Sequence, residues 1–158
     1  PIEFIRKQDD FTMTLYTARH TIVDLLQYIC MYKSKKGGKP DYLHPFLAFV
    51  AQNLQEYSQQ QGQADWRIKE ALLSAIGALS DQIDHLKELR SEMEPMLTKH
   101  VLPELQSSQA FLRRRACLTY ADFSSFKLKD NEHIKQAVDG IYQNLNSQEL
   151  PVRLAAAT

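Results

Sequence analysis

Apolar residues recur at helical spacing along almost the whole chain. In residues 10–32 the apolar positions lie three, four and seven residues apart: Leu15, Ile22, Leu25, Leu26 and Ile29. Such spacing gathers side chains on one face of an α-helix. The sustained alternation of apolar and polar residues that marks a half-buried strand is scarce. The pattern therefore predicts an all-α protein.

Caps and breakers divide this pattern into separate helices. Asp41 and Asp65 precede apolar segments, and a carboxylate there can accept hydrogen bonds from the free N–H groups of a first helical turn. A further helix is expected from about Ser91, and Pro103 should break or kink it. The remaining predicted helices cover residues 109–126, residues 131–145 and a segment that opens at about residue 149.

A repeat relates three of the predicted helices. The segments "WRIKEALLSAIGAL", "LRRRACLTYADF" and "PVRLAAAT" each place an alanine at an equivalent point, and these alanines lie 45 and 40 residues apart: Ala71, Ala116 and Ala156. HEAT and armadillo helix pairs repeat every 40–47 residues or so. The sequence thus predicts an α-solenoid, a right-handed superhelix of antiparallel HEAT helix pairs. The three aligned helices would form its inner row.

This repeat gives the expected domain organisation. Residues 1–158 form a single segment of a HEAT-repeat array. Its approximate units are an upstream helix at 10–32, then 41–81, then 91–126, and a truncated unit at 131–158. The chain lacks an initial Met and stops inside a predicted helix. We therefore expect a fragment of a longer array.

Composition excludes several classes of function. Lys plus Arg and Asp plus Glu are 19 each, so no global field attracts polyanions, and direct nucleic-acid binding is not expected. No apolar run approaches the ~18 residues of a membrane span. Cys30 and Cys117 each lie among apolar residues without a CxxC partner. They are expected to be buried, reduced thiols of an intracellular protein.

Patterns of catalytic or cofactor chemistry are also missing from the sequence. The five histidines are scattered, without HxxxH or HExxH spacing. No GxSxG elbow occurs, and "KKGGKP" lacks the spacing of a phosphate-binding loop. The sequence gives no support for an enzyme, a metal site or a cofactor.

Three consecutive arginines stand out in "AFLRRRACLTYADF". Because a helix turns about 100° per residue, adjacent arginines cannot share a face, so a triple-arginine anion clamp is not expected. Arg113 lies at the edge of the apolar stripe and aligns with Arg153, although Ile68 occupies the matching position of the earlier helix. We expect Arg113 and Arg153 to form a structural ladder with polar groups of the preceding turns.

Polar residues on the aligned helices form a second recurring feature. The repeat matches Glu70 with Arg115, Ser74 with Thr119, and Gly77 with Asp122. In a solenoid such a stripe lines one continuous surface, usually the concave binding face. The candidate partner contacts on this inner face are Arg67, Glu70, Ser74, Arg115, Thr119 and Asp122. The alternative is a merely solvated helix face. With Arg115 exposed and Arg113 structural, Arg113→Ala should lower the melting temperature more than Arg115→Ala.

An ordered series of segments carries a resemblance to a known family. The series runs "PIEFIRKQDDF", "YLHPFLAFVAQNL", "IKEALLSAIGALSDQI", "EPMLTKHVLPEL", "FLRRRACLTYADF" and "LPVRLAAA". It resembles the middle of an importin-β (karyopherin-β) nuclear transport receptor, most closely the importin seven/eight branch. In "RRRAC", Arg114 stands where that branch has a small residue, which leaves the helix assignment intact.

The resemblance implies a receptor that shuttles between cytoplasm and nucleus and acts by protein binding. It implies protein cargo such as ribosomal proteins or histones, together with Ran-GTP and Phe-Gly nucleoporins, all bound through the full-length protein. It carries no Ran-binding residue onto this chain. Two alternatives stay open at the level of sequence: a HEAT scaffold subunit of another assembly, such as a phosphatase or vesicle-coat complex, and a helical enzyme with a concealed site.

Overall fold

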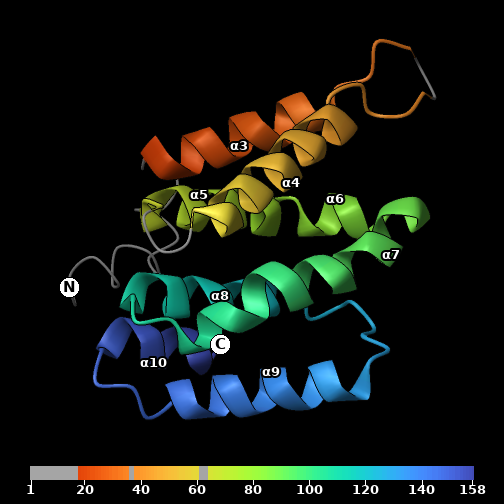
Figure 1. The fold of residues 1–158 in the computed structure, drawn as a ribbon. Helices are drawn as coiled ribbons and strands as arrows, with labels where there is room; N and C mark the ends of the chain where they lie inside the picture. The colour runs from red at the N-terminus through yellow and green to blue at the C-terminus, as the bar shows by residue number, and fades with distance from the viewer. Residues whose placement is uncertain (1–17, 36–37, 61–63) are drawn as a thin grey trace. The chain divides into compact units, whose positions relative to one another are not determined.

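The computed structural model describes residues 18–35, 38–60 and 64–158 (Figure 1). The first part of the helix expected at 10–32, residues 10–17, lies outside the described residues. Helices joined by turns make up the described chain, which has no strand, so the expected all-α class is confirmed. None of the described helices is both long and apolar enough to cross a membrane. The chain divides into two compact units, residues 1–50 and 51–158.

The described part of the first unit contains α3 (Ala18–Met31) and the beginning of α4 (Leu43–Gln59). The loop between them is closed at Asp41. Its N–H donates to the carbonyl of Tyr32, and its carboxylate accepts the N–H of Ser34 at 2.8 Å. Through these two hydrogen bonds Asp41 stabilises the loop that leads into α4. Cys30 on α3 is buried and free, as expected.

In the second unit, three helices lie side by side: α5 (Trp66–Ala78), α8 (Ala110–Asp122) and α10 (Leu150–Ala156). The middle helix, α8, packs against α5 on one side and α10 on the other (Figure 1). These are the three helices that the sequence repeat aligned. The predicted cap of α5 is confirmed, because the Asp65 side chain accepts the N–H of Arg67 at 3.0 Å.

The other helices of this unit connect and flank that row. After the short α6 (Ser80–Asp84) comes α7 (Lys87–Met96), which begins four residues before the expected start at Ser91. It continues into a π-helical turn, η1 (Leu97–Val101), and a 3₁₀ turn, η2 (Leu102–Gln106). Then α9 (Asn131–Asn144) packs against η2 and α10. Asp130 caps α9 by accepting the N–H groups of Glu132 and His133.

Pro103 lies where the segment that continues α7 changes from a π-helical to a 3₁₀ turn. Proline has no N–H to donate and its ring crowds the preceding turn, so an α-helix cannot run through it without a kink. Here the chain passes from π to 3₁₀ geometry, with Pro103 at the second residue of the 3₁₀ turn, and leaves the helix at Ser107. The expected break is confirmed, and it allows Leu105 to be buried beneath α9.

A glycine lets α9 approach this 3₁₀ turn closely. A Cβ atom added at Gly140 would lie 2.8 Å from Cδ1 of Leu105, closer than real carbon contacts. One helical turn later, the Asn144 amide donates to the Leu105 carbonyl at 2.8 Å. A backbone carbonyl buried by this approach thereby receives a hydrogen bond, as buried polar groups require.

The core of the second unit is aliphatic, with charged groups at one edge. Leu73, Leu79 and Val101 have no exposed surface. Beside them Lys69, which is 4% exposed, forms an ion pair with Glu104 at 2.5 Å and lies 5.2 Å from the centre of the Tyr57 ring. A buried ammonium group needs such a partner, because its transfer out of water is otherwise very costly.

Burial in this core also shifts the pKa values of two further side chains, Cys117 and His100. Burial raises the pKa of the Cys117 thiol to about 11, so this free cysteine stays protonated and unreactive. His100 in η1 is 7% exposed, and its Nδ1 has no hydrogen-bond partner among the described residues. Burial, followed by the charges of Lys69 and Lys99, lowers the pKa of His100 to about 4.

The low pKa of His100 predicts a pH dependence of stability. Unfolded histidine takes up its proton near pH 6.5, whereas folded His100 does so only near pH 4. Between these values the unfolded state binds more protons, so stability falls as the pH falls, by about 3 kcal/mol over the window. In urea unfolding from pH 7 to pH 4, His100→Leu should lose stability less steeply than wild type. Identical slopes would contradict the assignment.

Candidate protein-interaction site

The contact between α5 and α8 joins residues that the sequence repeat makes equivalent. The rings of Trp66 and Phe111 stack with centroids 4.9 Å apart and planes inclined by 6°. Further along the helices Glu70 pairs with Arg115. In both pairs the partners are 45 residues apart in sequence, the same interval that separates Ala71 from Ala116. The two helices therefore pack in register.

The third contact of this series involves a glycine. Gly77 faces Asp122, again 45 residues further on, and a Cβ atom at Gly77 would lie 2.1 Å from the Asp122 carboxylate. Absence of a side chain at Gly77 leaves the space that the carboxylate occupies. Since residues 66, 70 and 77 share one face of α5 at helical spacing, the three contacts form one continuous seam.

The centre of this seam is the ion pair between Glu70 and Arg115, in which two guanidinium nitrogens share one carboxylate oxygen. Nε and Nη2 of Arg115 both donate to one Glu70 oxygen, at 3.1 and 3.0 Å. The side chains are 9% and 18% exposed. The expectation that Arg115 is an exposed inner-face residue is therefore wrong. Helical geometry gave its angle on α8, but the in-register neighbour α5 covers that angle.

The expectation that Thr119 is an inner-face contact residue is wrong for the same reason. It has no exposed surface, and its hydroxyl donates to the Arg115 carbonyl one turn earlier at 2.8 Å. Ser74, the residue that the repeat matches with it, is partly buried. Thr119 therefore contributes to helix packing in this structure and presents nothing to solvent.

Two of the remaining inner-face candidates, Arg67 and Asp122, are exposed. Arg67 has 72% of its side chain exposed, and its guanidinium lies 5.0 Å from the centre of the Trp66 ring, within cation–π range. Asp122 is exposed at the far end of the seam. It stays a prediction that Arg67 and Asp122, together with Glu70 and Ser74, contact a partner protein.

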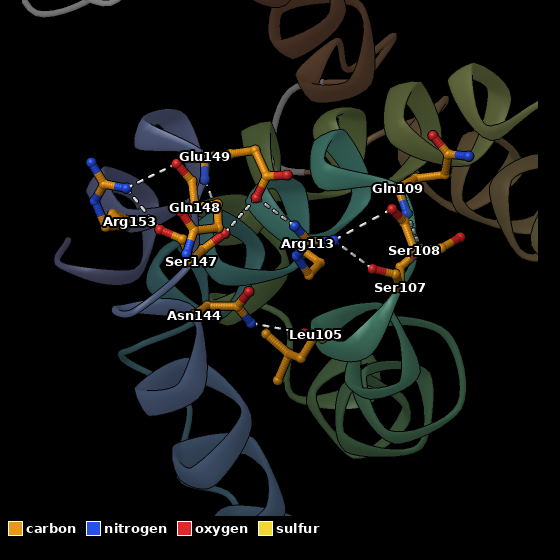
Figure 2. A network of polar contacts seen from close by, with 10 residues as sticks. All are labelled: Leu105, Ser107, Ser108, Gln109, Arg113, Asn144, Ser147, Gln148, Glu149 and Arg153. Carbon is orange, nitrogen blue, oxygen red and sulfur yellow. Dashed lines mark hydrogen bonds and ion pairs between the residues drawn. The ribbon is translucent and has the colours of Figure 1, made fainter.

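The two arginines expected in a structural ladder bind their preceding turns in the same way (Figure 2). Nη1 of Arg113 donates to the carbonyl of Ser107 at 2.7 Å, and Nη1 of Arg153 donates to the carbonyl of Ser147 at 2.7 Å. Each arginine lies six residues after its acceptor. These carbonyls belong to turns that precede α8 and α10, where helix geometry supplies no intrahelical partner.

Arg113 also reaches into the next repeat. Its Nη2 donates to Glu149 at 2.8 Å, and the Ser147 hydroxyl donates to the same carboxylate oxygen at 2.7 Å. The pKa of Glu149 is lowered mainly by the hydrogen bond from Ser147, and the positive charge of Arg113 lowers it further. Glu149 was not singled out from the sequence. The ladder role of Arg113 and Arg153 stays a prediction, now with defined partners.

A buried histidine makes a second connection between repeats. His133 of α9 is 2% exposed; Tyr120 of α8 lies 2.8 Å from its Nε2, and Thr98 of η1 lies 3.2 Å from its Nδ1. The Thr98 hydroxyl donates to the Glu94 carbonyl, so it accepts from Nδ1 of His133. No motif spacing in the sequence pointed to this cluster.

Comparison with known proteins finds relatives along nearly the whole chain. The chain is 31% identical over 160 residues to a probable importin-7 homolog of Dictyostelium discoideum, an alignment that covers 100% of the chain and 15% of that protein. It is 28% identical over 155 residues to an importin beta-like SAD2 homolog of Arabidopsis thaliana, with 98% and 15% covered. Human importin-8 is 30% identical over 158 residues, with 99% and 14% covered. No family model and no solved structure matches.

The chain is similar to members of the importin-β family over nearly its whole length. Within that family it is similar to importin-7 and importin-8, as the ordered motifs predicted. The α-solenoid class expected from the repeat is confirmed with it. The chain spans about 15% of the length of the relatives named above. It therefore corresponds to a short stretch of the importin array.

The burial of Arg115 reverses the stability order expected from the sequence. In this segment, Arg115→Met should lower the free energy of unfolding by about 2 kcal/mol or more, because it removes one charged partner of an ion pair in a largely buried seam. Arg113→Met should cost less, because its partner Glu149 is 46% exposed and solvent screens the pair. Guanidinium unfolding of both variants tests the order. A larger loss for Arg113→Met would contradict it.

Proposed function

We propose that the chain is a segment of a nuclear transport receptor that carries protein cargo through nuclear pores under the control of Ran-GTP. The match to importin-7 and importin-8 relatives along nearly its whole length is the observation that supports this proposal most strongly. In this role the segment acts by protein–protein binding and performs no catalysis. The parent protein shuttles between cytoplasm and nucleus.

The packing of the second unit suits such a role mechanically. In the inner row, α8 contacts one neighbour on each side, so a small rotation at either contact changes the direction of the row. In solenoids such rotations accumulate along the array and change its curvature. The polar and aromatic contacts at these joints include the Glu70–Arg115 ion pair, the Trp66–Phe111 ring stack and the Arg113–Glu149 ion pair.

The partners that we propose for the whole receptor are cargo proteins such as ribosomal proteins or histones, Ran-GTP and Phe-Gly nucleoporins. Within this segment, the accessible residues of the predicted inner face are Arg67 and Asp122, with Ser74 and Glu70 partly covered between them. Both signs of charge occur on this strip. It therefore fits a partner surface that also mixes basic and acidic groups better than a uniformly charged one.

A segment exchange tests the proposal. Human importin-8 in which the aligned segment is replaced by this chain should still accumulate a fluorescent core histone in nuclei of permeabilised cells, and Ran-GTP should release the histone. An unrelated helical array of the same length at that place is the control, and it should abolish both. A folded chimera that neither binds the histone nor responds to Ran-GTP would count against a transport role and favour a scaffold of another assembly.

A further inference from the structure

A polar groove of about 600 Å³ lies between two successive turns of the array, in the region of Figure 2. One wall consists of residues 105–107 together with Arg113. The other consists of the end of α9 and the turn that follows it, from Gln143 to Glu149. The volume is within the range of sites that hold a small ligand or a short stretch of peptide.

The two walls are held at a fixed separation. Arg113 spans them by donating to Ser107 on one side and to Glu149 on the other, at 2.7 and 2.8 Å. Below this contact, Asn144 donates one amide hydrogen to Leu105 across the groove and the other to Gly140 on its own helix. A groove fixed before binding loses less conformational entropy when a partner enters it.

The lining is rich in carboxamides and has no net charge. Five of the ten lining residues carry a primary amide: Gln106, Gln143, Asn144, Asn146 and Gln148. Arg113 and Glu149 are the charged members, and they neutralise each other. Four of the amides are exposed, and Asn144 is 4% exposed with both amide hydrogens committed, so its carbonyl oxygen is what it can offer to a ligand.

These features specify the chemistry of a ligand. A primary amide presents a donor and an acceptor side by side, which matches the N–H and C=O groups of an extended peptide backbone. A phosphate or nucleic acid would need uncompensated cationic groups, and the guanidinium here is already paired. Leu105 is the only residue with an apolar side chain among the lining residues, so an apolar ligand would offer most of the lining polar groups no hydrogen-bond partner.

We propose that this groove binds an extended segment of a partner protein through its peptide backbone. The inference deepens the proposed transport function, on which it rests for the biological partner, by naming one surface and the kind of segment it holds. Recognition of the backbone makes the groove tolerant of partner sequence, because the hydrogen bonds go to groups that every residue shares.

Binding of a defined probe to the chain tests the proposal. The probe is a fluorescent, end-blocked octapeptide of glycine, serine and asparagine, and its partner probe is the same peptide with alternate backbone nitrogens methylated. Fluorescence anisotropy should show saturable binding of the first probe. Methylation removes backbone donors and should weaken binding at least about tenfold. Equal binding of the two probes would overturn the proposal.

Matched variants of the chain locate the site. Gln143→Ala, Asn146→Ala and Gln148→Ala together should weaken binding at least about tenfold. A control with Gln52→Ala, Gln59→Ala and Gln136→Ala, all outside the groove lining, should bind like wild type. Circular dichroism melting of both variants confirms folding.

Unchanged binding by the groove variant, or tighter binding of an eight-nucleotide RNA than of the peptide, would overturn the proposal. These readouts involve neither Ran nor a nuclear pore, so they are independent of the segment exchange.

Discussion

The Glu70–Arg115 ion pair fixes how consecutive helices of the inner row meet. It lies between an aromatic stack and a glycine–carboxylate contact, and each of these joins residues 45 positions apart. A shift by one residue would rotate the pairing residues by about 100° and separate all three contacts at once. The register is thus determined jointly by the three contacts, with the largely buried ion pair at the centre.

The next joint of the row is built differently. Between α8 and α10 the repeat interval is 40 residues, and the cross-link moves from the face of the helices to the turns that precede them. There Arg113 binds its own turn and the next one, in a partly exposed position. The first joint is therefore largely buried and the second more accessible. Arg113 and Glu149, the ion pair of the second joint, also line the polar groove.

Periodicity and repeat alignment predicted the helices and the inner row, because apolar spacing and repeat length report directly on burial and stacking. The alignment even named the pairs Glu70–Arg115 and Gly77–Asp122 as equivalent positions. It could not show that equivalent residues touch, and so Arg115 and Thr119 were placed on a solvent-facing stripe. Whether a residue is exposed depends on the position of the neighbouring helix. The angle of that residue around its own helix gives no information about that position.

Other parts of the site depend on contacts that have no local signal. Glu149 and Asn144 are single polar residues near the third helix pair, and their partners lie 36 and 39 residues earlier. The His133 cluster combines residues of η1, α8 and α9. The approach of η2 to α9 at Gly140 brings Asn144 to Leu105, and no local sequence pattern indicates that approach.

The in-register pairing of equivalent residues is the central claim, and a charge exchange tests it most directly. Glu70→Arg and Arg115→Glu, made singly, place like charges together in a largely buried seam and should each lower the free energy of unfolding by several kcal/mol. The double variant restores opposite charges and should recover at least half of the summed loss, measured by chemical unfolding. Additive losses, with no recovery in the double variant, would contradict the pairing.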